Sequence, residues 1–226
     1  MTTFQQGRGI ESRQAASLTR RQCRETLAPS LVGSEPAWRM GPYLWTHQYT
    51  HLSPTTSFVL DDGTGRAVGY CIGCPDIPAF AAGYGRYVDE VLERPGCELA
   101  RPADVSSARE PWALEDGSVN ATCLAQLAWN PRWLLLDGNE DVIDGGRYRA
   151  TMHIDLLEGW QGRGWGRRLI ERFVEAVRAE RQPDTRGIWI GVAADNGKVV
   201  PFYEKMGFRV REGGDGGSIV MVKDLD

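Results

Sequence analysis

A glycine-rich turn, Gln161-Gly-Arg-Gly-Trp-Gly166, constrains the fold more than any other segment of this chain. It stands between a strand-like run at residues 147–157 and an amphipathic helical pattern at 165–181. Glycines at alternate positions free the backbone of side chains, so successive N–H groups can point toward an anion. The helix that follows adds unsatisfied N–H donors and the positive end of its dipole. The turn therefore predicts a pyrophosphate cradle, and with it a phosphorylated cofactor.

Two common phosphate-binding motifs do not fit this turn. A Walker A loop needs Gly-Lys-Ser/Thr at the helix start, where this chain has Gly166-Arg-Arg168. A dinucleotide fingerprint needs a glycine three positions after Gly164, where this chain has Arg167. The pattern that remains is Gln/Arg-x-x-Gly-x-Gly, which residues 161–166 satisfy.

This pattern resembles the turn of the GNAT family of N-acetyltransferases, and a second motif follows in the family's order. Asn196 is followed after six residues by Tyr203, and then by Gly207-Phe208. More narrowly, residues 57–63, 68–80 and 153–157 resemble the acetyltransferase-like domain associated with some O-GlcNAc hydrolases and its free-standing microbial relatives. The resemblance covers about residues 43–80 and 147–223, whereas residues 81–146 and the first forty match no family that we can name.

The resemblance implies an α/β fold of the GNAT type, a central mixed twisted sheet with helices on both faces. The order of patterns agrees, because strands at 147–157, 187–193, 208–211 and 219–223 alternate with helices at 165–181 and 199–206. Further upstream, Asp-Asp-Gly-Thr-Gly separates two β-rich runs and predicts a hairpin. We expect one acetyltransferase-like domain over residues 36–226, preceded by a leader over 1–35 that is partly helical or disordered.

An insertion at about residues 75–146 precedes the cofactor-binding strand. Residues 84–93 have helical spacing, residues 93–116 predict a long loop, and the apolar run 122–136 is broken by Pro131. Upstream of it, residues 38–51 predict a short helix and loop interrupted by Pro42. Two interpretations of the insertion stay open, a lid over the acceptor side and a packed decoration without a catalytic role.

The resemblance also implies acetyl-CoA as the cosubstrate. Backbone N–H groups of the turn would hold its pyrophosphate, and main-chain groups at the end of the preceding strand would hold its pantetheine arm. Asn196 would bond the arm through its amide or cap the helix before Gly197. The arginines near the turn could bind phosphate or be solvated charges. The predicted cofactor-binding residues are Leu156, Leu157, Gln161, Gly162, Arg163, Gly164, Trp165, Gly166, Arg167 and Asn196.

Three side chains are candidates for catalysis. Tyr203 stands where the family has a tyrosine that protonates the departing thiolate, although it could instead be a core aromatic beside Phe202. On the key strand, His153, Asp155 and Leu157 share one face, and Met152, Ile154 and Leu156 share the other. Asp155 could deprotonate the amine, and His153 could be the base or orient Asp155. Alternatively, the two form a structural hydrogen-bonded pair, and Glu158 is a third candidate base.

Composition excludes several other classes. A net charge of −4 disfavours nucleic-acid binding, and no apolar stretch is long enough to cross a membrane. Five cysteines suggest a reducing compartment, by default the cytoplasm. Cys71 and Cys74 would point to opposite faces of a strand, so we expect no metal site.

Two function hypotheses follow from the motifs. The first is an acetyl-CoA-dependent N-acetyltransferase that acts on a primary amine of a small molecule, peptide or protein. The second is a catalytically inactive interaction domain with the same fold, with or without CoA binding. A homodimer is compatible with either hypothesis.

Overall fold

The computed structural model describes residues 3–6, 31, 33–143, 145, 147–180, 182, 184–211 and 218–225. The helical part expected in the leader falls almost wholly outside these residues, as does the loop of the expected C-terminal hairpin. The leader contributes one element that the sequence did not predict, because residues 3–6 form a strand paired with residues 58–61.

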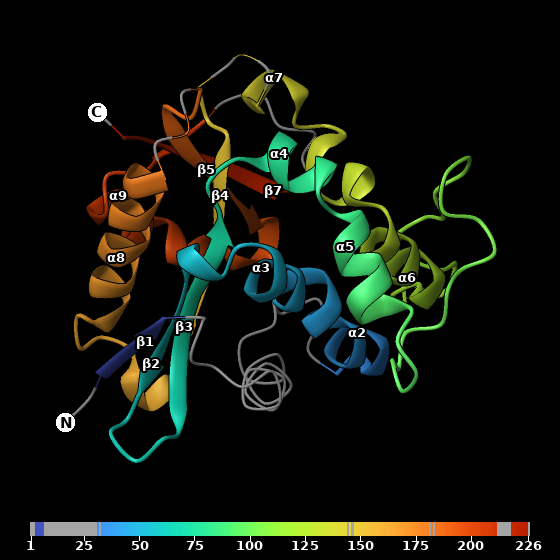
Figure 1. Cartoon of the computed structure of the whole chain (residues 1–226), viewed down its shortest axis with the longest axis horizontal. Helices are drawn as coiled ribbons and strands as arrows, with labels where there is room; N and C mark the ends of the chain where they lie inside the picture. Colours follow the sequence, from blue (N-terminus) through green and yellow to red (C-terminus); the bar gives the residue numbers. More distant parts are fainter. Residues whose placement is uncertain are drawn as a thin grey trace.

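The centre of the molecule is a seven-stranded sheet in the order β1-β2-β3-β4-β5-β7-β6 (Figure 1). Adjacent strands are antiparallel except β4 and β5, which are parallel. The mixed sheet with helices on both faces confirms the expected fold class. The strands are β1 (Thr3–Gln6), β2 (Ser57–Asp61), β3 (Ala67–Cys74), β4 (Ala150–Leu156), β5 (Gly187–Ala193), β6 (Arg209–Val210) and β7 (Ser218–Asp224).

The two parallel strands part soon after they meet. β4 and β5 pair only at Ala150 with Ile188 and at Thr151 with Trp189. Burial changes at the same place, because residues 150–152 of β4 are buried whereas residues 153–156 are half-buried. The sheet therefore opens between the carboxyl ends of its two parallel strands.

One face of the sheet is covered by α8 (Trp165–Glu180), with α9 (Val200–Lys205) beside it (Figure 1). The apolar stripe expected on α8 is buried against the sheet together with Met152 and Ile190, which confirms the helical periodicity. That stripe consists of Leu169, Ile170, Phe173, Val174 and Val177. The packing of this apolar face on the sheet thus fixes the position of α8, which begins directly after the glycine turn.

The other face carries the helices that precede β4 in the chain, and here the insertion packs as an ordered layer. Its side chains share one core with β3 and β5, through Tyr70, Ile72 and Trp189. The helices are α2 (Glu35–Trp45), α3 (His47–Leu52), α4 (Ile77–Ala82), α5 (Gly85–Tyr87), α6 (Ala121–Trp129) and α7 (Glu140–Ile143). π-Helical turns follow at Val88–Leu92 and Arg132–Leu136, and 3-10 turns occur at Pro54–Thr56, Glu158–Trp160 and Ala194–Val199.

On this face the expected interruption at Pro42 was wrong, whereas the helical spacing of residues 84–93 is confirmed. Pro42 lies inside α2 and does not interrupt it, and the Pro42 carbonyl accepts both the backbone N–H and the hydroxyl of Thr46 at the helix end. The helix expected over 84–93 is a short α-helix that continues as a π-turn, closed by the Glu93 N–H on the Val88 carbonyl. Pro42 is buried, so the packing of α2 in this core overrides the local tendency of proline to break a helix.

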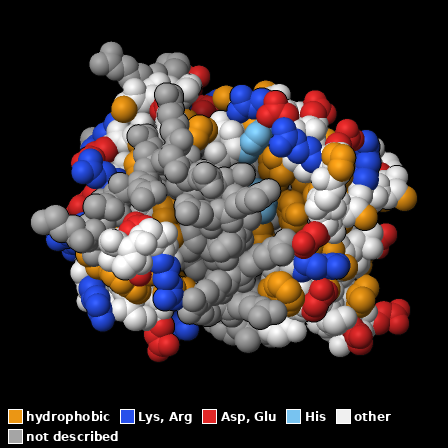
Figure 2. All heavy atoms as spheres, turned by 60° about the horizontal axis from the view of Figure 1, so that its bottom comes forward, with side chains coloured by type: hydrophobic (Ala, Val, Ile, Leu, Met, Phe, Trp, Pro, Cys, Tyr) orange, Lys and Arg blue, Asp and Glu red, His pale blue; other side chains and the backbone are white. Residues whose placement is uncertain are grey.

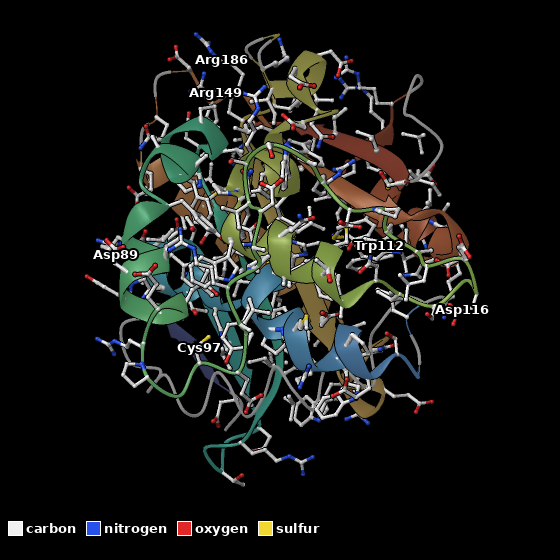
Figure 3. All side chains as sticks on the ribbon, turned by 90° about the vertical axis from the view of Figure 1, so that its right-hand side faces the viewer. Asp89, Cys97, Trp112, Asp116, Arg149 and Arg186 are labelled. Atoms are coloured by element: carbon white, nitrogen blue, oxygen red, sulfur yellow. The ribbon has the colours of Figure 1, made fainter. Side chains whose placement is uncertain are left out.

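Residues 93–120 confirm the predicted long loop, with an isolated bridge between Ala113 and Val119 (Figure 3). The buried Gln126 amide ties the loop to α6. Its nitrogen donates to the carbonyls of Asp104 and Ala108, and its oxygen accepts the N–H of Glu110. These bonds make the loop part of the layer.

Figure 2 shows basic and acidic side chains interleaved over the described surface of one face. Among the described residues, every helix is too short or too polar to cross a bilayer.

Candidate functional site

The glycine turn adopts the backbone conformation that its sequence predicts. Gly162 and Gly164 have φ values of 69° and 80°, in the left-handed region that side chains disfavour. A Cβ at either position would meet nothing within 4 Å, so backbone conformation and not space requires glycine there. The turn leads directly into Trp165, the first residue of α8.

Side chains around the turn hold it against the end of β4 and place cations beside it. The Gln161 amide donates to the Leu156 carbonyl at 2.8 Å. The guanidinium of Arg163 lies over the Trp160 ring at 5.9 Å, and that of Arg168 lies over Trp165 at 4.8 Å. These contacts hold two positive charges near the helix start, while Arg167 is exposed.

Gly166 brings α9 close to the start of α8. A Cβ on Gly166 would lie 3.0 Å from Cζ of Phe202, which is tighter than most Cβ contacts in proteins. The absence of a side chain at this position therefore lets α9 approach the turn. Tyr203, the next residue on α9, is placed near the turn as a result.

Tyr203 lies half-buried against the core on the α8 side of the sheet. Its ring contacts Phe202 and Phe208, with centroids 5.2 and 5.7 Å away. Burial raises the pKa of the Tyr203 phenol above its ordinary value, and the nearby Asp155 carboxylate and Cys71 thiol raise it further. The phenol is therefore protonated at neutral pH, which is the state that a proton donor needs.

Asp155 accepts a short hydrogen bond from the hydroxyl of Tyr70. Tyr70 lies on β3, directly opposite Asp155 in the antiparallel register, and is buried. The sequence analysis did not single out Tyr70 as a site residue. Only the register between β3 and β4 brings the two residues together, and no local pattern encodes that register.

His153 has a different environment from Asp155. Its ring lies 5.4 Å from that of Tyr49, which belongs to the layer of N-terminal helices. Part of the imidazole reaches the surface, yet enough protein surrounds it that burial lowers the pKa of His153 to about 4. His153 is therefore neutral at neutral pH. The contacts described thus differ for the two side chains, with Tyr70 at Asp155 and Tyr49 at His153, and the alternative of a His153–Asp155 hydrogen-bonded pair stays a prediction.

Leu157 departs from the expected alternation along β4. Met152, Ile154 and Leu156 share one face as predicted, and this face packs on the α8 side. Leu157 joins the same core because β4 ends at Leu156. Its N–H donates to the Val68 carbonyl and its carbonyl accepts the N–H of Trp160. The main chain of Leu157 therefore begins the 3-10 turn at Glu158–Trp160, which precedes the glycine turn. Glu158 is exposed.

Asn196 lies in the short helical segment that follows β5, at the same end of the sheet as the glycine turn. Its φ and ψ of −108° and 25° are non-helical, and α9 begins only at Val200. Asn196 is thus the non-helical residue at the kink between two short helical segments, and both its capping role and its cofactor-binding role stay predictions.

The two cysteines of β3 are core residues on opposite faces, as expected. Cys71 packs with the α8 core and Cys74 with the core of the other face. Burial raises the pKa of both thiols well above the ordinary value. The described part of the chain holds no group of three potential metal ligands.

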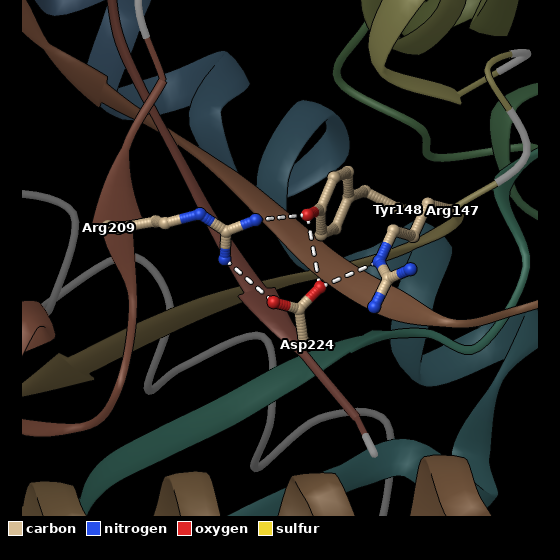
Figure 4. A network of polar contacts seen from close by, with 4 residues as sticks. All are labelled: Arg147, Tyr148, Arg209 and Asp224. Atoms are coloured by element: carbon tan, nitrogen blue, oxygen red, sulfur yellow. Dashed lines mark hydrogen bonds and ion pairs between the residues drawn. The ribbon is translucent and has the colours of Figure 1, made fainter.

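A separate polar network lies at the opposite end of the sheet (Figure 4). Asp224 on β7 accepts hydrogen bonds from Arg147 at 2.8 Å and from the Tyr148 hydroxyl at 3.0 Å, and pairs with Arg209 at 2.8 Å. These bonds, led by that from Arg147, lower the pKa of the Asp224 carboxyl. A hollow of about 520 Å³ lies beside the network. Two guanidinium groups share one carboxylate here, and the network ties the segment before β4 to β6 and β7.

Comparison with known proteins agrees with this geometry. A model of the acetyltransferase (GNAT) family matches residues 93–208, just over half of the chain, including the glycine turn and Tyr203. The crystal structure of SsHAT superposes with a TM-score of 0.74 at 24% identity, covering 100% of this chain and 98% of that one.

Two more distant structures share the fold. An acetyltransferase of the GNAT family from Staphylococcus aureus Mu50 gives a TM-score of 0.51 at 9% identity, with 100% of both chains covered. The NatC complex bound to Gag peptide and CoA gives 0.50 at 10% identity, covering 100% of this chain and 99% of that one.

Proposed function

Because this chain belongs to the acetyltransferase (GNAT) family, we propose that it transfers an acetyl group from acetyl-CoA to a primary amine. The observation that supports the proposal is that several expected site elements lie at one end of the sheet. The opening between β4 and β5, the glycine turn, Tyr203 and Asp155 all meet there. The acceptor is a small molecule, a peptide or a protein. We also propose that the chain belongs to the O-GlcNAc hydrolase-associated branch, because residues of β2, β3 and β4 resemble that branch.

The cosubstrate would bind along the opening and the turn. Beyond Thr151 the described part of β4 has no ladder partner in β5, so the edge of residues 152–156 can pair with the amides of a pantetheine arm. The backbone of residues 162–166 and the start of α8 would receive the pyrophosphate. Arg163, Arg168 and the exposed Arg167 add positive charge around it. Asn196 would reach the same region from the end of β5.

The reaction then needs one base and one acid. Asp155 accepts a proton from the amine, and the amine nitrogen bonds to the acetyl carbon as the carbon–sulfur bond breaks. Tyr203 donates its proton to the departing sulfur and recovers one from the solvent. The products are an acetylated amine and CoA with a free thiol. Neutral His153 would line the acceptor side without carrying charge.

The test of this proposal is acetyl-CoA binding by calorimetry, followed by release of CoA thiol with a panel of amines. We expect micromolar binding that is abolished in Gly164→Glu, where a carboxylate would occupy the anion cradle. Tyr203→Phe should bind acetyl-CoA normally but lose about 100-fold in kcat, because only the proton donor is removed. Binding without turnover of any amine would favour an inactive CoA-binding domain. Absence of binding would refute the proposed cosubstrate.

A further inference from the structure

We propose that Tyr70 is a positioning residue that holds the Asp155 carboxylate in the orientation and charge state required of a base. This inference rests on the proposed function. It concerns a buried residue that no motif in the sequence marks as part of the site.

The position of Tyr70 is fixed by the sheet and not by a loop. β3 and β4 pair without a break from Gly69 opposite Leu156 to Cys74 opposite Thr151, and this ladder sets Tyr70 opposite Asp155. The Tyr70 ring is buried in the core that the N-terminal helices form with the sheet. Since the ring is packed, its hydroxyl meets the carboxylate from a rigid frame.

The placement of the pair matters for chemistry. Asp155 is in the half-buried part of β4, beyond the point at which β5 departs. The orientation of this carboxylate matters, because a misplacement of about 1 Å is enough to cost roughly 100-fold in rate. The hydroxyl of Tyr70 fixes one carboxylate oxygen. It acts on the base only by this hydrogen bond and neither gains nor loses a proton during the reaction.

The same bond favours the ionised form of Asp155. A hydrogen bond donated to a carboxylate stabilises the charged state, and only the charged state can take a proton from an amine. Desolvation at a half-buried position would act in the opposite direction. Tyr70 would therefore oppose the effect of burial at the residue where ionisation is needed.

The chain supplies a matched control for this inference. Tyr148 is buried to nearly the same extent, with an exposed fraction of 8% against 7% for Tyr70, and its hydroxyl also donates to an aspartate, Asp224. That pair lies at the far end of the sheet (Figure 4). Tyr148→Phe therefore removes a tyrosine–aspartate hydrogen bond, together with the one that this hydroxyl accepts from Arg209, without touching the proposed site.

The experiment compares Tyr70→Phe and Tyr148→Phe in the full chain. Carbon-13 NMR follows titration of the Asp155 carboxyl, assigned by its loss in Asp155→Asn. We expect this carboxyl to titrate at higher pH in Tyr70→Phe and unchanged in Tyr148→Phe. In turnover, Tyr70→Phe should lower kcat by about 10- to 100-fold and move the acidic limb of the pH profile to higher pH, with KM for acetyl-CoA unaltered.

An unchanged Asp155 titration in Tyr70→Phe would overturn the inference, as would equal kinetic effects in the two variants. Should Tyr70→Phe fail to fold, 3-fluorotyrosine placed at position 70 provides a second test. This stronger donor should move the Asp155 titration to lower pH, and no movement would again refute the role. The NMR readout needs no turnover, so an inactive wild-type protein would refute the proposed function separately.

Discussion

Replacement of His153 by glutamine should remove a defined part of the pH dependence of folding. Burial lowers the pKa of His153 from an ordinary value of 6.5 to about 4. The folded protein therefore disfavours the protonated ring, while the unfolded chain takes up the proton as pH falls through 6.5. The stability that neutral His153 contributes is fully present above pH 6.5, is lost progressively toward pH 4, and changes no further below that.

The size of this effect follows from the two pKa values. A difference of about 2.5 pKa units corresponds to about 3 kcal/mol once both states are fully protonated. At pH 5 the unfolded chain is largely protonated and the folded protein largely is not, so the loss there is about 2 kcal/mol. This figure is an upper value, since part of the ring reaches solvent.

Urea unfolding followed by tryptophan fluorescence measures this difference, since the chain has 8 tryptophans. Between pH 7.5 and pH 5, the wild type should lose about 2 kcal/mol more stability than His153→Gln. Other titrating groups are common to both proteins and cancel in the comparison. Between pH 7.5 and 8.5 the difference between the proteins should stay constant. Parallel losses down to pH 5 would refute the argument that burial keeps His153 neutral.

Two further predictions separate the site from the scaffold. Gly164→Ala and Gly65→Ala each place a side chain in a left-handed backbone conformation with open space around it. Each should therefore lower the free energy of unfolding in urea by about 1 kcal/mol. Only Gly164→Ala should weaken acetyl-CoA binding in calorimetry. Asp76→Asn should lower the free energy of unfolding by about 3 kcal/mol or more in the same assay, because it removes the buried carboxylate that pairs with both Nε and Nη2 of Arg149. The affinity of the folded protein for acetyl-CoA should be unchanged. Destabilisation below about 1 kcal/mol in Asp76→Asn, or an equal affinity loss in the two glycine variants, would contradict these assignments.

The parts of the fold that the sequence predicted are those encoded locally. The left-handed glycines of the turn, the apolar stripe of α8 and the alternation along β4 each depend on residues within a few positions of one another. The Asp-rich turn of the β2–β3 hairpin is equally local, since the Asp61 carboxylate accepts the N–H groups of Gly63 and Gly65.

The features that the sequence missed depend on long-range packing. Tyr70 and Asp155 lie 85 residues apart, and only the strand register joins them. The pairing of β1 with β2 likewise links distant segments. The helix through Pro42 is retained because α2 packs in the core of the insertion layer, which a local rule about proline does not include. For Leu157, the error came from extending strand alternation one residue past the end of β4.

The parting of β4 and β5 has a consequence for the lifetime of the protein. Interior strands normally satisfy each other's backbone groups, whereas the separated stretch of β4 resembles an exposed sheet edge that can recruit foreign strands. A cosubstrate that pairs along this stretch would complete the sheet and stabilise only the folded state. Each tenfold rise in its concentration above the dissociation constant would then add about 1.4 kcal/mol of stability. Resistance to heat, aggregation and proteolysis would in this way follow the supply of acetyl-CoA.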